Sequence, residues 1–112
     1  MEPLLETMFN DVDSSHEQEI RSLAVPHGYR CLETKVPRSC WAEKGYARRL
    51  GYVRTTEDRV HPPFVQDLMM EWTGQHWDVI DMAASHAPFY SKPEELAQHI
   101  ATFVTRFGLL KD

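Results

Sequence analysis

The chain has 112 residues, 42% of them hydrophobic, which suffices for one small folded domain and excludes a disordered chain. Its 12 basic and 17 acidic residues give a net charge of −5, and the basic residues are scattered, so we expect no nucleic-acid partner. No apolar run approaches the roughly 18 residues of a membrane span, and no signal peptide is recognisable. We therefore expect a cytoplasmic protein without a membrane partner.

The cysteines and histidines show no spacing typical of a metal site. Cys31 and Cys40 lie outside any C-x-x-C motif, which favours free thiols in a reducing compartment. The six histidines form neither an H-x-x-x-H nor an H-E-x-x-H group. We therefore expect no metal and no cofactor.

The first part of the chain predicts two short helices. Residues 3–9 are mostly apolar and have the length of about two helical turns. Ser14 and Glu17 form a capping-box pattern that predicts the start of a second helix, which ends before Pro26.

Residues 27–49 predict a mostly irregular segment with one helical turn around 41–46. An irregular stretch of this length inside a compact domain is usually functional or covered by another element. Trp41 and Tyr46 are its large aromatic side chains. We assign residues 1–49 to a helical and irregular segment, separate from the residues that follow.

Residues 50–112 predict a strand, a helix, a strand and a helix. The strands are residues 50–55 and 77–82, both rich in apolar side chains. The helix between them begins after Pro62 and ends at Thr73 and Gly74. A second capping box, Ser91 with Glu94, predicts a last helix with Pro93 in its first turn, running to Gly108.

Connections this short imply two parallel strands joined by a right-handed crossover, hence an α/β fold. Parallel strands end at the same edge of their sheet, where open α/β sheets place their ligand sites. Asp58 follows the first strand and His86 follows the second, 86 − 58 = 28 residues later. We expect the carboxylate and the imidazole to meet at this edge.

Two stretches resemble the C-terminal half of the α/β-hydrolase fold, nearest to the small esterases related to plant methylesterases and hydroxynitrile lyases. They are YVRTTEDRVHPPFVQDLMMEW and VIDMAASHAPFYSKPEELAQHI. FNDVD, residues 9–13, is similar to the start of the lid in such enzymes. The resemblance implies a partial hydrolase fold, with a lid-like segment over residues 1–49 and core over 50–112. It places Asp58 at the triad acid and His86 at the triad histidine.

The chain also departs from that family in two respects. The family carries its nucleophile on a G-x-S-x-G turn upstream of the lid, and none of the five glycines here frames a serine in this way. Ser85 lies on the histidine turn and not at a strand-to-helix elbow. Ala87 follows the histidine where the lyases of the family carry lysine, which weighs against a lyase.

Three further residues are candidates for lining a substrate site. His61 lies close to Asp58 in the sequence, and Trp41 and Tyr46 could form an apolar ceiling from the lid-like segment. A solvated loop position explains His61 equally simply, and core or interface packing explains the two aromatics.

Two functions remain open from the sequence. The chain could be the acid-and-base half of an esterase for a small, fairly apolar ester, completed by a complementary N-terminal hydrolase half. Alternatively, it could be a non-catalytic truncated paralogue, or an accessory or binding protein of small-molecule metabolism, because the covalent mechanism requires a nucleophile. Either form could be a homo-oligomer, since an exposed parallel strand edge favours pairing.

Overall fold

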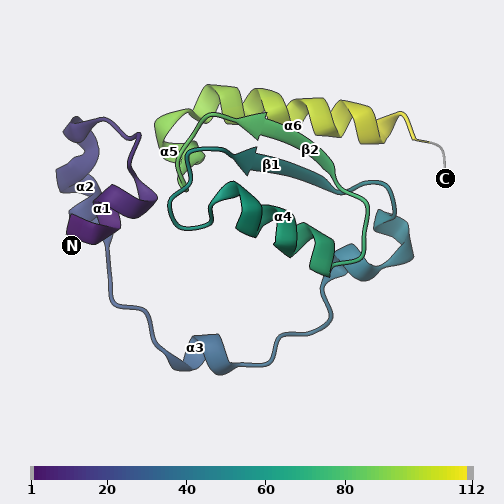
Figure 1. The fold of residues 1–112 in the computed structure, drawn as a ribbon, viewed down its shortest axis with the longest axis horizontal. Helices are drawn as coiled ribbons and strands as arrows, with labels where there is room; N and C mark the ends of the chain where they lie inside the picture. The colour runs from purple at the N-terminus through teal and green to yellow at the C-terminus, as the bar shows by residue number, and fades with distance from the viewer. Residues whose placement is uncertain (1, 111–112) are drawn as a thin grey trace.

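The computed structural model describes residues 2–110 and is of the mixed α/β class. Short helices and turns make up the first part of the chain (Figure 1). They are α1 (Glu2–Met8), η1 (Ser14–His16), α2 (Glu17–Leu23), α3 (Arg30–Glu33), η2 (Cys40–Ala42) and η3 (Lys44–Tyr46). The two predicted helices of this part are confirmed, whereas α3 carried no signal that we recognised.

The second part alternates strands and helices in the predicted order. Its elements are β1 (Gly51–Thr55), α4 (Pro63–Trp72), β2 (Asp78–Met82), α5 (Pro88–Ser91) and α6 (Pro93–Gly108). Gly74 ends α4 in the left-handed conformation, with φ of +64°, as the helix-stop pattern predicts. The short helix α5 was not expected.

The two strands pair in parallel, with Gly51 opposite Asp78 and Thr55 opposite Met82. The predicted parallel pairing is therefore confirmed. Figure 1 shows the sheet between α4 on one side and α6 on the other. Both strands end at the side of the molecule where α5 lies, so the segments that follow them share one edge of the sheet (Figure 1).

Ion pairs of Arg54 connect β1 to the crossover helix. Its guanidinium donates two hydrogen bonds to the carboxylate of Asp67 in α4, at 2.8 and 2.9 Å. This bidentate geometry pairs the planar guanidinium with the planar carboxylate. A third contact, at 3.3 Å, reaches Asp81 of β2. The arginine thus joins three elements of the βαβ unit.

Helix α6 packs against β1 through Phe103. A Cβ atom built on Gly51 would lie only 2.7 Å from the nearest ring atom of Phe103. The absence of a side chain at this position therefore permits the helix to approach the strand closely.

The most deeply buried side chains collect at the carboxyl ends of the strands. Met82 is 1% exposed, and Ala84, Ser85 and Ala87 are fully buried. Gln66 of α4, at 1%, lies in the same region through its contacts with β1. The core is consequently centred on the turn that carries His86.

Both capping-box predictions are wrong in their detail. At the start of η1, the cap is Asp13 and not Ser14. The side chain of Asp13 accepts a hydrogen bond from the backbone N–H of Ser15 at 2.8 Å. Ser91 is the last residue of α5, and α6 begins after Lys92 without a side-chain cap. The Ser91 hydroxyl instead donates to Asp11, a partner 80 residues away in the sequence that no local pattern can reveal.

Several large apolar side chains of the two long helices α4 and α6 are exposed. They include Phe64, Leu68, Met69 and Trp72 of α4, and Ile100 and Val104 of α6. The two cysteines are free and exposed. Among the residues described, no helix combines the length and the apolarity needed to cross a membrane.

Candidate functional site

Asp58 lies in the turn after β1, where its carboxylate accepts hydrogen bonds on both oxygens. The backbone N–H groups of Val60 and His61 donate to Oδ1 at 2.8 and 2.9 Å. The hydroxyl of Thr55 donates to Oδ2 at 3.1 Å. The side chain of Asp58 is only 4% exposed, so these donors replace the water that the carboxylate loses on burial.

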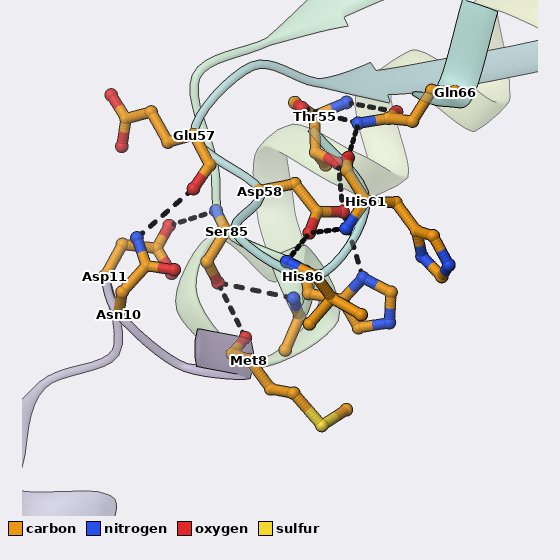
Figure 2. A network of polar contacts seen from close by, with 12 residues as sticks. Met8, Asn10, Asp11, Thr55, Glu57, Asp58, His61, Gln66, Ser85 and His86 are labelled. Carbon is orange, nitrogen blue, oxygen red and sulfur yellow. Dashed lines mark hydrogen bonds and ion pairs between the residues drawn. The ribbon is translucent and has the colours of Figure 1, made fainter. Parts of the chain in front are cut away.

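His86 meets Asp58 from the turn after β2. Its Nδ1 lies 2.9 Å from Asp58 Oδ2, and its ring is 29% exposed (Figure 2). An ionised carboxylate can only accept, so the shared proton belongs to Nδ1 of the imidazole. In the neutral ring, Nε2 then carries the lone pair and can act as a base. The predicted meeting of acid and imidazole is present in the structure.

The pKa of Asp58 lies below its ordinary value of 3.8. Burial raises this pKa, but the hydrogen bonds from the His61 backbone, the His86 side chain and the Val60 backbone together lower it by more. The group is therefore ionised at neutral pH, which is the state that orients an imidazole.

A buried glutamine supports this arrangement from α4. The Gln66 carboxamide accepts from the Thr55 N–H at 3.1 Å and donates to the Thr55 carbonyl at 2.8 Å. It also donates to the carbonyl of His61 at 2.7 Å. Gln66 thus holds the last residue of β1 and the far end of the Asp58 turn together, as Figure 2 shows.

Asp11, from the loop after α1, holds the histidine turn from the opposite side (Figure 2). Its Oδ2 accepts from the Ser85 N–H at 3.0 Å and from the Ser91 hydroxyl at 2.9 Å. Burial raises the pKa of Asp11, but these serine hydrogen bonds lower it below the usual value. The buried Ser85 hydroxyl donates to the Met8 carbonyl at 3.2 Å, and this use supports its exclusion as a nucleophile.

Of the three predicted lining residues, the structure brings only His61 to the site. Its ring centroid lies 5.2 Å from that of His86. Trp41 belongs to η2 and Tyr46 to η3, and this segment leads into the start of β1 at Gly51. The histidine turn follows the opposite ends of the strands. Trp41 and Tyr46 thus do not line the Asp58 and His86 pair.

An apolar groove of about 310 Å³ lies between the N-terminal helices and α5. Side chains from α1, α2 and α5, and from residues next to them, line it: Leu4, Met8, Phe9, Ile20, Leu23, Phe89 and Tyr90. Phe89 is 63% exposed, so the groove is open to solvent. Because α5 follows His86 directly, the groove is next to the histidine turn.

Sequence reasoning missed Thr55, Gln66 and Asp11 as parts of this site. Gln66 lies on the buried side of α4, away from the exposed apolar row of Phe64, Leu68 and Trp72, so the apolar pattern gave no signal for it. Asp11 has no local signal either, because its partners Ser85 and Ser91 lie 74 and 80 residues away.

The chain is similar to a curated enzyme over part of its length. It is 42% identical over 52 residues to the pyrethroid hydrolase of Sphingobium wenxiniae. The match covers 46% of this chain and 19% of that enzyme's length. No family model matches the chain, and no solved structure matches it.

Proposed function

We propose that Asp58 and His86 form the acid and base pair of a carboxylic-ester hydrolase that acts on small, fairly apolar molecules. The observation that carries this proposal is the 2.9 Å contact between His86 Nδ1 and a buried carboxylate. The partial similarity to a pyrethroid hydrolase supports hydrolysis as the reaction class.

In this mechanism, His86 Nε2 accepts the proton of a serine hydroxyl as the serine oxygen attacks the ester carbonyl carbon. The imidazolium then returns the proton to the leaving alcohol, and a water molecule releases the acid from the acyl-enzyme by the same two steps. Asp58 keeps the proton on Nδ1 and stabilises the charged ring. The nucleophile would come from a polypeptide segment outside these 112 residues, which hold no G-x-S-x-G turn.

The apolar groove beside α5 would hold the hydrophobic part of the ester. Its lining carries Phe9, Phe89 and Tyr90, and aromatic walls favour compact apolar groups. A volume of about 310 Å³ is at the small end of the range typical of ligand pockets. The proposed substrate is therefore small.

A chimera provides the test. The 112-residue chain replaces the similar segment of the Sphingobium wenxiniae pyrethroid hydrolase, and hydrolysis of a nitrophenyl ester is measured. We expect turnover, and we expect His86→Ala to lower kcat by about three orders of magnitude or more, since the serine then lacks its base.

His76→Ala is the matched control, because the His76 ring is 75% exposed and pairs only loosely with Asp78, at 3.5 Å. It should leave turnover unchanged. A folded chimera without turnover would contradict the proposal, as would a His86→Ala chimera that retains full activity.

The alternative is a non-catalytic binding protein, favoured by the open apolar groove and by the lack of a nucleophile turn. Incubation of the purified chain with activated esters and a serine-directed probe tests whether the isolated chain is an enzyme or a non-catalytic binding protein. Labelling or turnover by the chain alone would exclude the binding protein.

A further inference from the structure

Three side chains with metal-binding atoms converge at the carboxyl edge of the sheet. They are Asp58, His61 and His86, and one ligand atom of each lies within 4.8 Å of the other two. We expected no metal site from the spacing of the histidines along the chain. That spacing does not reveal this cluster, because it is the βαβ crossover that brings His86 next to the turn that holds Asp58 and His61.

We propose that this cluster, the Asp58–His61–His86 site, binds a divalent transition-metal ion, and that Zn²⁺ is the ion it fits. Two imidazole nitrogens and one carboxylate oxygen are a donor set that zinc prefers, whereas Mg²⁺ and Ca²⁺ prefer oxygen ligands. Three protein ligands leave a fourth tetrahedral position for water.

The groups behind these ligands are already in place. Metal-ligating carboxylates are generally oriented by further hydrogen bonds, and here the backbone N–H of Val60 and the hydroxyl of Thr55 bind Asp58. Gln66 holds the carbonyl of His61 at 2.7 Å. The supporting contacts fix the backbone of the site and leave the two imidazole rings to adjust.

The adjustment required is small. Bonds of about 2.0–2.2 Å to a tetrahedral zinc ion place ligand atoms roughly 3.4 Å apart. Ligand atoms up to 4.8 Å apart must therefore approach by about 1.4 Å at most, and the 2.9 Å contact between His86 Nδ1 and Asp58 Oδ2 must open by about 0.5 Å if those two atoms coordinate, both within reach of side-chain rotations. His61 and His86 are both half-buried, so an ion can enter from solvent.

Metal binding and proton transfer would exclude each other at His86, since a coordinated nitrogen has no lone pair for a proton. Only this consequence rests on the proposed esterase function. Binding of the ion itself is independent of it and is measured without any substrate.

The experiment titrates the complete chain with Co²⁺, whose visible absorption reports on its ligands, and then displaces it with Zn²⁺. We expect one ion per chain with a tetrahedral spectrum. His61→Ala and His86→Ala should each weaken binding by more than the roughly 10–100-fold that loss of a supporting contact costs. The exposed His76 provides the matched control, and His76→Ala should bind as the parent chain does.

His61→Ala is the decisive variant because it should fold. The hydrogen bonds of His61 run through its backbone N–H and carbonyl, which alanine retains. Near-ultraviolet circular dichroism verifies the fold. The proposal is overturned if the parent chain binds no Co²⁺ in the micromolar range, or if folded His61→Ala binds it with unchanged affinity and spectrum.

Discussion

At Asp58, hydrogen bonds from four groups meet two carboxylate oxygens, and this concentration of donors makes the residue important for stability as well as for orientation. In Asp58→Asn, the backbone donors Val60 and His61 keep an oxygen acceptor, but the amide nitrogen facing Thr55 and His86 can only donate, and the negative charge that strengthens these hydrogen bonds is lost. We expect the free energy of unfolding near pH 7 to fall by about 1–3 kcal/mol. Urea titration of both proteins measures it.

The same substitution has a definite pH dependence. Because the folded-state pKa of Asp58 is lowered, the ionised carboxylate stabilises the fold above its ordinary pKa of 3.8, and this contribution is lost as the pH falls through the folded-state value. The stability difference between the parent and Asp58→Asn should therefore shrink below pH 3.8. A difference that stays constant into that range would contradict the role of the charge.

Asp11 connects the N-terminal segment to the histidine turn, again at the scale of single contacts. Asp11→Ala removes the acceptor for the Ser85 N–H and the Ser91 hydroxyl, so the turn should open more easily. We expect faster hydrogen exchange at the Ser85 amide, measured by NMR. Asp13→Ala is the control, since Asp13 caps only the neighbouring Ser15, and unchanged exchange in Asp11→Ala would contradict the role of Asp11.

At the scale of elements, the contact of α6 with β1 depends on Gly51. In Gly51→Ala, the new methyl group would meet the Phe103 ring at 2.7 Å, so the helix must move away from the strand. We expect a loss of about 1–3 kcal/mol in thermal or urea unfolding. Gly45→Ala is the matched control because its Cβ would meet no atom within 4 Å, and equal stability of the two variants would refute the close approach.

The elements of residues 50–110 could be predicted because their signals are local. Pro63 in the first turn of α4, Gly74 after it and the short apolar strands each act on their own neighbours in the sequence. The cap of α6 failed as a prediction because Ser91 has a distant partner, Asp11, that competes for its hydroxyl. The prediction that Trp41 and Tyr46 line the site was wrong because the position of an irregular segment depends on tertiary contacts.

At the scale of the whole molecule, the chain is more open than a compact domain of its mass. Its accessible surface is 8403 Å², against about 6,400 Å² expected for a compact monomer of 13.1 kDa. The radius of gyration is 16.3 Å, against roughly 13 Å for a compact chain of this length. Exposed apolar side chains such as Phe64 and Trp72 contribute to this surface.

We therefore expect the chain to associate with further copies of itself. An exposed strand edge predicts the same homo-oligomer from the sequence. Sedimentation velocity should give masses above 13.1 kDa that rise with concentration. Trp72→Ser, which removes a side chain that is 80% exposed, should shift the equilibrium toward the monomer. Gln75→Ser, at an exposed polar position, should not, and a monomer at every concentration would contradict the expectation.

The sequence by itself determined the βαβα order, the parallel pairing and the meeting of Asp58 with His86, because strand patterns and the handedness of crossovers restrict the chain to one sheet edge. Only the tertiary structure decided which groups surround that pair. The surrounding groups come from other elements: Gln66 from α4, Asp11 from the loop after α1, and the ring of His61 from the turn before α4. Contacts between elements depend on packing in three dimensions, which no local sequence pattern encodes.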